Sequence, residues 1–237
     1  MRKVQFVNDH FYHIYNRGVE KRDVFLDQND YIRFIHNLFE FNDIRPAPAY
    51  DRRNVGNRIS YIGNVGNPIS NIKRERIVDV ICFSLMPNHF HLLLRQVSEK
   101  GITKFLRKLG VGYTNAFNLK NKRVGPLFQG KFKAAHINND VYLTHISRYI
   151  HLNPLELKEP QWKEKGVGDW PSADNFLSSY RWSSYPDFIG QSNFPSIING
   201  QEFILENYFN NDILEYKKFI QEWAERDVKD ISNFILE

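Results

Sequence analysis

The sequence has little cysteine and no long hydrophobic run. Cys82 is the single cysteine among 237 residues, so the chain can form neither an internal disulfide nor a cysteine-based zinc site. The uninterrupted apolar stretches are only a few residues long, and no apolar segment near the N-terminus precedes a small-residue cleavage site. We therefore expect a cytoplasmic protein with no membrane partner. Any metal must be bound by His, Asn, Gln or carboxylate side chains.

The charged residues are distributed unevenly along the chain. Residues 72–158 contain 15 Lys and Arg against 5 Asp and Glu, a net charge of +10, whereas residues 160–237 contain 7 against 13, a net charge of −6. A basic block that carries aromatic residues is typical of proteins that bind a phosphate-rich partner, although lysines also serve simply to solvate helix faces. The acidic C-terminal region argues against nonspecific binding by the whole chain.

The hydrophobic pattern predicts an α+β fold. The segment 11–18 alternates aromatic and polar residues as a strand does, and 27–42 has apolar residues at helical spacing, with Asn29 or Asp30 as the expected N-cap. Strands are predicted at 76–86, 89–97 and 131–137, and helices at 101–120 and 138–154, the last capped by Asn139 or Asp140 and ended by Pro154. The order β, α, β, β, α, β, α indicates a sandwich of helices packed on an antiparallel sheet.

Two segments fall outside this pattern. Residues 44–76 contain Pro, Gly, Asn and Arg with few apolar residues, and VGNRIS (55–60) recurs as VGNPIS (65–70), which predicts a flexible insertion. From about residue 155, aromatic clusters lead into an acidic helical tail. We therefore divide the chain into residues 1–158, which hold the predicted chemistry, and residues 159–237, an accessory and mostly helical C-terminal region.

His89 and His91 lie two positions apart at the start of a predicted strand. Side chains at i and i+2 of a strand share a face, so the two imidazoles can chelate one divalent cation, but alternating polar residues are also what a half-exposed strand shows. Tyr149 and Asn153 share a helix face four residues apart. A phenol, an amide oxygen and two imidazoles brought together suit Mg²⁺ or Mn²⁺ with open positions for phosphate oxygens and water. The four residues together predict a phosphodiester site.

Two motifs in this region resemble a known family. MPNHFHLLL (86–94) is similar to the HUH motif (histidine, bulky hydrophobic residue, histidine) of the single-tyrosine transposases. GPLFQGKFKAAHINNDVYLTHISRYIHLNP (125–154) resembles the later signature of their REP-associated branch. The resemblance covers about residues 11 to 190, including the Trp-Ser-Ser-Tyr stretch in RWSSYPDFIG (181–190). It implies a ferredoxin-like nuclease domain in residues 1–158, followed by a helical C-terminal extension.

The resemblance also implies a mechanism and residue roles. In relatives a tyrosine attacks a DNA phosphate, leaving a 5′-phosphotyrosine link and a free 3′-hydroxyl, and Tyr149 matches that nucleophile. His89 and His91 match the metal-binding histidines, and Asn153 stands where relatives place a polar third ligand, often Gln, which has a longer reach. The implied function is cleavage and strand transfer of single-stranded DNA at hairpin or REP-type sequences, with Mg²⁺ or Mn²⁺ as cofactor. We expect a monomer or a homodimer.

The basic block, together with Arg17 of the first predicted strand, supplies candidates for contacts with DNA phosphates. They are Arg17, Lys104, Arg107, Lys108, Lys120, Lys122, Arg123, Lys131 and Lys133. Exposed aromatic residues could stack on unpaired bases, and Phe128 and Gln129 either do so or are structural.

Several alternatives stay open from the sequence. Tyr113 is a rival nucleophile because it also follows the histidine strand on a helix, although only Tyr149 has an Asn four residues later. His136, His145 and His151 are candidates for further ligands. The competing function is a domesticated, catalytically inactive hairpin-DNA-binding regulator, and a zinc-dependent hydrolase on another fold is a distant third. We favour the enzyme because a binder would not need to retain both histidines and the tyrosine.

Overall fold

The structure is a computed structural model that describes residues 4–46 and 74–225. Most of the predicted insertion at 44–76 (its residues 47–73) and the end of the acidic tail (226–237) lie outside the described residues. The first part of the chain forms β1 (Phe11–Arg17), η1 (Val19–Lys21), α1 (Gln28–Glu40), β2 (Val78–Met86), β3 (His89–Gln96), α3 (Gly101–Lys120), β4 (Lys133–Ile137) and α4 (Asp140–Leu152). The remainder forms η3 (Asn153–Leu157), α5 (Trp162–Lys165), α6 (Trp170–Ser179), α7 (Tyr185–Phe188), α8 (Glu202–Phe209) and α9 (Ile213–Ala224).

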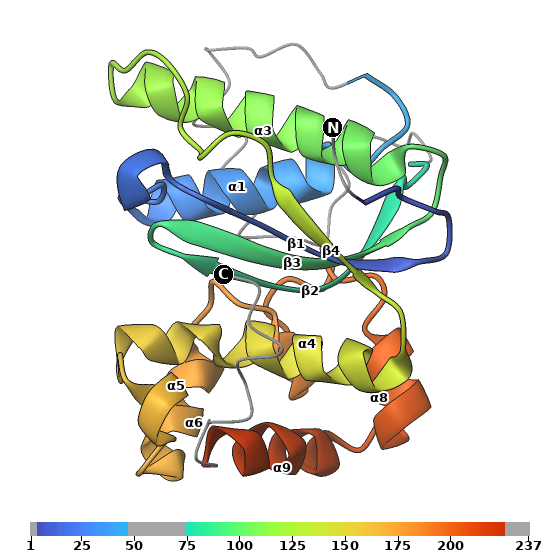
Figure 1. The fold of residues 1–237 in the computed structure, drawn as a ribbon, viewed down its shortest axis with the longest axis vertical. Helices are drawn as coiled ribbons and strands as arrows, with labels where there is room; N and C mark the ends of the chain where they lie inside the picture. Colours follow the sequence, from blue (N-terminus) through green and yellow to red (C-terminus); the bar gives the residue numbers. More distant parts are fainter. Residues whose placement is uncertain (1–3, 47–73, 226–237) are drawn as a thin grey trace.

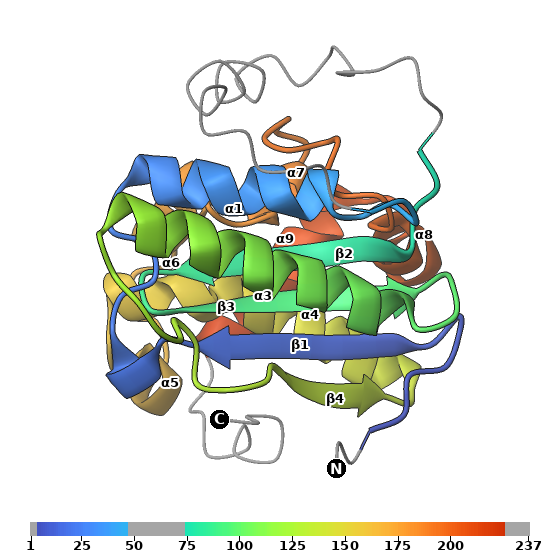
Figure 2. The same cartoon turned by 90° about the horizontal axis from the view of Figure 1, so that it is seen from above.

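The four strands form one antiparallel sheet in the order β2-β3-β1-β4 (Figure 2). With β1 and β3 in the centre and a helix after β1 and after β3, this is the ferredoxin-like arrangement. The predicted α+β sandwich is therefore confirmed, including the order of its elements.

Helices cover both faces of the sheet (Figure 1). Helices α1 and α3 lie on one face, where Phe90 of β3 packs against Phe34 of α1 with ring centroids 5.0 Å apart. Helix α4 and the C-terminal helices lie on the other face. Because side chains alternate along a strand, the neighbours of Phe90, His89 and His91, face α4.

The helix boundaries follow from capping side chains. Asp27, not the predicted Asn29 or Asp30, caps α1, because its carboxylate accepts hydrogen bonds from the N–H groups of both of those residues. Asn139 caps α4 as predicted by accepting from the N–H of Tyr142. The prediction that Pro154 ends this helix was imprecise. α4 ends at Leu152 and the chain continues through Pro154 as the 3₁₀ turn η3, where a proline near the first position loses no required hydrogen bond.

The C-terminal region covers the edge strand β2 and shares the core of the sheet. The N–H of Leu85 donates to the carbonyl of Trp182 at 2.9 Å, and the N–H of Ser184 donates to the carbonyl of Phe83 at 3.0 Å. Further along, the N–H of Asn199 donates to the carbonyl of Val80 at 3.1 Å. An open strand edge exposes unpaired backbone groups, so this cover satisfies β2. In the described ranges, no helix combines the length and the apolar character that crossing a membrane requires.

Candidate functional site

The candidate site lies between the central strands and the C-terminal half of α4. The register pairs Tyr15 of β1 with His91 and Arg17 with His89, so these four side chains emerge on the face that α4 covers. Residues sixty positions apart in sequence meet here, because α4 carries Tyr149 onto the same histidines. His89, His91 and Tyr149 are all buried.

His91 is held by a histidine of the neighbouring strand. Nε2 of His13 lies 2.9 Å from Nδ1 of His91, and the two rings stack with centroids 5.1 Å apart. One nitrogen of such a pair donates and the other accepts. When Nδ1 of His91 donates, its Nε2 carries the lone pair that a metal ion needs.

His89 is oriented by the asparagine that precedes it in the β2–β3 turn. Oδ1 of Asn88 lies 2.5 Å from Nδ1 of His89, while the amide nitrogen of Asn88 donates to the carbonyl of Lys21 at 3.4 Å. Because an amide oxygen only accepts, Nδ1 of His89 is the donor and Nε2 carries a lone pair. That lone pair faces Oδ1 of Asn153 at 3.2 Å.

Two hydrogen-bond acceptors that face one another at this distance fit a cation between them. Neighbouring ligands of an ion with metal–ligand bonds near 2.1 Å lie about 3 Å apart. Asn153 is fully buried, and its Nδ2 has no hydrogen-bond partner among the described residues. Rotation of this amide would let Nδ2 donate to His89 instead, so Asn153 can satisfy the imidazole without a metal and ligate a metal when one binds.

The donor set is neutral and incomplete, as an open site requires. Within residues 4–46 and 74–225, no group of three or more His, Cys, Asp or Glu side chains is arranged to hold a metal. His89, His91 and Asn153 would therefore supply three neutral donors and leave further positions for phosphate oxygens and water. The facing acceptors and the oriented imidazoles fit a divalent cation.

Tyr149 lies against the same imidazoles. Its ring makes edge-to-face contacts with His91, at a centroid distance of 5.5 Å, and with His13, at 6.0 Å. Nζ of Lys163 in α5 lies 5.5 Å from the centroid of the same ring. The side chain is only 2% exposed, so a DNA phosphate can reach the hydroxyl only if a neighbouring group moves.

The rival tyrosine lies on the opposite face of the sheet. Tyr113 of α3 packs among Phe25, Phe34 and Phe128, and its hydroxyl donates to the carbonyl of Val24. Burial raises the pKa of this phenol well above its ordinary value. The sheet therefore separates Tyr113 from both histidines.

The three further histidines also have partners elsewhere. His136 lies 2.8 Å from Nδ1 of His10 at the surface, and His145 is hydrogen-bonded to Arg148. His151 is fully buried between the hydroxyls of Tyr216 and Ser184, each at 2.8 Å, and burial lowers its pKa to about 3. His151 thus joins α4 to the C-terminal helices.

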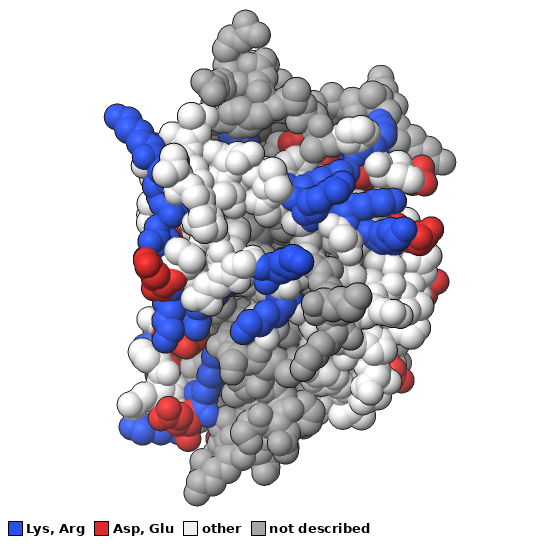
Figure 3. Space-filling view, turned by 45° about the horizontal axis from the view of Figure 1, so that its top comes forward, with Lys and Arg blue, Asp and Glu red and all other residues white. Residues whose placement is uncertain are grey.

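The predicted basic residues lie on two sides of the sheet. Arg17 and Lys133 are on the histidine side, where Nζ of Lys133 lies 5.4 Å from the ring centroid of Tyr15. Lys104, Arg107, Lys108, Lys120, Lys122 and Arg123 belong to α3 or the loop after it, on the far side. Seen obliquely from the α3 side, Lys and Arg side chains form separate groups with uncharged surface between them (Figure 3).

Three of the predicted DNA contacts have internal partners, among them Arg123, whose guanidinium donates to Oδ1 of Asn118 at 2.6 Å. Nζ of Lys120 lies 2.7 Å from the carboxylates of both Asp27 and Asp30. Nζ of Lys108 donates to the carbonyls of Asp43 and Arg45 at 2.6 and 2.5 Å. Binding DNA with either lysine would cost these interactions.

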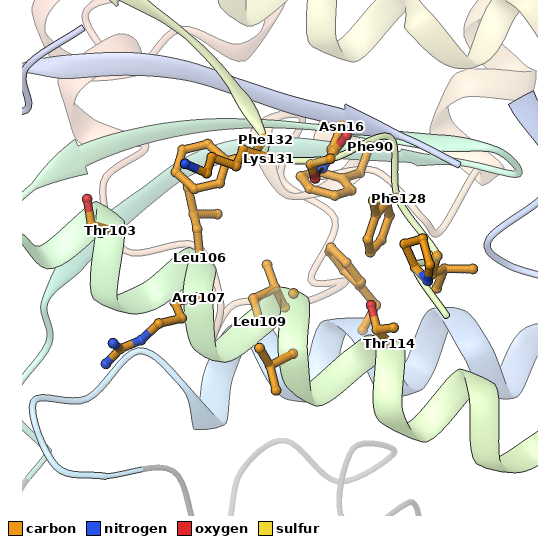
Figure 4. Close-up of a pocket in the computed structure, with 16 residues that line it drawn as sticks. Asn16, Phe90, Thr103, Leu106, Arg107, Leu109, Thr114, Phe128, Lys131 and Phe132 are labelled. Atoms are coloured by element: carbon orange, nitrogen blue, oxygen red, sulfur yellow. Dashed lines mark hydrogen bonds between the residues drawn. The ribbon is translucent and has the colours of Figure 1, made fainter. Parts of the chain in front are cut away.

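A hollow lies on the α3 side of the sheet. It has a volume of about 610 Å³ and is lined mainly by apolar side chains, with Leu106 and Leu109 of α3 facing Phe128 and Phe132 (Figure 4). Phe128 is buried here, whereas Gln129 next to it is exposed. Arg107 and Lys131 also line this hollow. The sheet separates it from the histidine cluster.

Three residues of the site were not predicted from the sequence: His13, Asn88 and Lys163. His13 lies between the buried residues Tyr12 and Ile14 in a strand, so its imidazole points to the face of the sheet opposite theirs. This alternation was the signal that could have found it. Asn88 follows Pro87 in a pair typical of a turn, and this local pattern does not indicate its contact with His89. Nothing local marked Lys163, which lies in the region predicted to be accessory.

Part of the chain matches a known protein family. Residues 50–153 match the family model described as IS200-like transposases. The predicted resemblance is confirmed. A solved structure of a REP-associated tyrosine transposase bound to a REP hairpin has a TM-score of 0.51 and 14% identity, over 84% of this chain and 91% of that chain, which shows a shared fold. No curated protein matches the chain.

The IS200-like match supports a transposase-type function that acts on DNA. The matched residues 50–153 include His89, His91, Tyr149 and Asn153. They include neither His13, which precedes the match, nor Lys163, which follows it. Part of the candidate site is therefore contributed by segments outside the IS200-like region.

Proposed function

We propose that the protein cleaves and rejoins single-stranded DNA at hairpin or REP-type sequences through a 5′-phosphotyrosine link on Tyr149. The observation that carries the proposal is the convergence of Tyr149 of α4 and Asn153 of η3 with His89 and His91 of β3. The IS200-like match supports DNA as the substrate, and the hairpin bound by the structurally similar transposase suggests the form of that DNA.

The reaction exchanges one phosphodiester for another. The phenolic oxygen of Tyr149 forms a bond to phosphorus, the bond from phosphorus to the 3′-oxygen breaks, and the phenol proton ends on the released 3′-hydroxyl. Because the bond energy is kept in the covalent link, a 3′-hydroxyl can attack it later and rejoin strands without ATP. A free phenol has a pKa of about 10 and is therefore mostly protonated at neutral pH, so the residues around Tyr149 must promote its attack.

The surrounding residues have separate roles in metal binding, imidazole orientation and phosphate binding. His89, His91 and Asn153 would hold Mg²⁺ or Mn²⁺, which when bound supplies a Lewis acid for a phosphate oxygen. Asn88 and His13 fix the orientation of the two imidazoles through their Nδ1 atoms. Arg17, which emerges beside His89, and Lys133, beside Tyr15, would bind neighbouring phosphates of the strand.

A test is the detection of a covalent adduct. The protein is incubated with Mn²⁺ and single-stranded hairpin oligonucleotides labelled at either end, and a denaturing gel is examined for labelled protein. A 5′-phosphotyrosine link retains the fragment on the 3′ side of the cut, so only the 3′-labelled strand should label the protein. Tyr149→Phe should abolish the adduct because the ring is kept and only the nucleophilic oxygen is lost.

Two outcomes would contradict this proposal. An adduct of wild-type yield with Tyr149→Phe would show that Tyr149 is not the nucleophile. Tight hairpin binding with no adduct on any hairpin of the host genome would favour the inactive regulator, for which the burial of Tyr149 is the supporting observation.

A further inference from the structure

Lys163 and Glu156 form an ion pair beside the buried nucleophile. Nζ of Lys163 lies 3.3 Å from a carboxylate oxygen of Glu156. Glu156 belongs to η3, the turn that begins at Asn153. The same ammonium lies 5.5 Å from the ring centroid of Tyr149. Helix α5, which carries Lys163, lies beside the C-terminal part of α4 (Figure 1). One cation therefore pairs with a carboxylate and lies beside the ring of Tyr149.

The two partners of this pair have opposite relations to an incoming phosphate. A phosphate bonded to Tyr149 brings negative charge next to the ring, where the ammonium of Lys163 attracts it and the carboxylate of Glu156 repels it. The side chains are 18% and 36% exposed, so the pair lies near the surface and its net stabilisation is small. A phosphate that makes a charge-assisted hydrogen bond can replace Glu156 as the partner of Lys163 at little cost.

We propose that Lys163 binds the phosphate that Tyr149 attacks, and that Glu156 holds Lys163 until that phosphate arrives. This inference rests on the proposed function. Lys163 then acts as a catalytic residue supplied by the C-terminal region, from outside the IS200-like match. Glu156 acts as an internal competitor of the DNA. The exchange of one anion for another keeps the ammonium paired both before and after DNA binds.

The test compares the rate of adduct formation at subsaturating 3′-labelled hairpin DNA and saturating Mn²⁺ in matched variants. Lys163→Gln should slow the reaction by about 10- to 100-fold, the usual effect of losing a hydrogen bond from a charged group. Lys163→Arg should recover most of the rate because the positive charge returns. Glu156→Gln should accelerate the reaction by about two- to fivefold, because a weak competing ion pair is removed.

Lys165→Gln is the control for charge alone. Lys165 lies on the same short helix and pairs with Oε1 of Gln161, so its loss should leave the rate unchanged. Thermal unfolding of each variant checks that the fold is retained.

The signs separate a binding role from a structural one. If the ion pair only stabilised the fold, Lys163→Gln and Glu156→Gln would change the rate in the same direction. A wild-type rate for Lys163→Gln, or a rate for Glu156→Gln at or below the wild-type rate, would overturn the exchange while leaving the Tyr149 adduct intact. If the wild-type protein forms no Tyr149-dependent adduct, the proposed function itself fails, and the role of Lys163 fails with it.

Discussion

His13 and His91 share a hydrogen bond across the two central strands, with Nε2 of one 2.9 Å from Nδ1 of the other. The contact joins β1, which lies outside the IS200-like match, to the proposed metal ligand on β3. His13 also contacts the ring of Tyr149, so one imidazole touches both the ligand and the nucleophile.

Replacing His13 should weaken metal binding without removing a ligand. His13→Phe keeps a ring against Tyr149 but removes the partner of Nδ1 of His91, and loss of such an outer partner typically lowers metal affinity by about 10- to 100-fold. We expect this decrease in a Mn²⁺ titration followed by electron paramagnetic resonance. His13→Gln should restore part of the affinity by supplying an amide.

His136→Phe is the matched control for that titration. It breaks a similar histidine pair, with His10 at 2.8 Å, but at the exposed ends of β1 and β4. An equal loss of Mn²⁺ affinity in this variant would show that the effect of His13 is not specific to the site.

Asn153 should set the affinity of the site through its side-chain oxygen. Asn153→Ala removes the acceptor that faces His89, and we expect at least about a 10-fold loss of Mn²⁺ affinity. Asn153→Asp places a carboxylate at the same reach and should raise the affinity, because hard cations prefer charged oxygen ligands. Unchanged Mn²⁺ binding in Asn153→Ala would remove this residue from the ligand set.

Tyr113→Phe should affect stability but not strand cleavage. The variant loses the buried hydrogen bond to the carbonyl of Val24, which should lower the free energy of unfolding by about 1 kcal/mol in urea denaturation. Adduct formation should be unchanged because Tyr113 is on the far side of the sheet. Loss of the adduct in Tyr113→Phe but not in Tyr149→Phe would reverse the assignment of the nucleophile.

His145 should make the contact between α4 and α9 sensitive to acid. Burial, with the charge of Arg148, lowers the pKa of His145 from 6.5 to about 4. The folded protein therefore keeps the imidazole neutral, while the unfolded chain binds a proton as the pH falls below 6.5. The contribution of His145 to the free energy of unfolding is therefore present above pH 6.5 and is lost as the pH falls from 6.5 to 4.

This loss can be measured against His145→Gln. Allowing for the partial exposure of the side chain, the wild-type protein should lose about 1 kcal/mol more than the variant between pH 6.5 and pH 4. The ring proton signals of His145 in an NMR titration report the pKa directly. A measured value at or above 6.5 would contradict the prediction.

Local pattern was sufficient for much of the fold. The alternation in 11–18 and 89–97 and the helical spacing in 101–120 predicted the elements within a few residues, because periodicity follows directly from strand and helix geometry. The α1 cap was misplaced because Asp27, Asn29 and Asp30 all suit that position, and only the chain path selects among them.

The sequence by itself determined two pairs of the candidate site. His89 and His91 share a face because strands repeat every two residues, and Tyr149 and Asn153 share a face because helices repeat every 3.6. Neither periodicity could bring the two pairs together. Only the tertiary structure decided that α4 covers the face of the sheet with the histidines, while Tyr113 packs on the opposite face. It also decided that the register of β1 places His13 against His91 and that α5 brings Lys163 next to the ring of Tyr149. These relations depend on strand register and layer packing, which are set by contacts between residues far apart in the chain and leave no local pattern in the sequence.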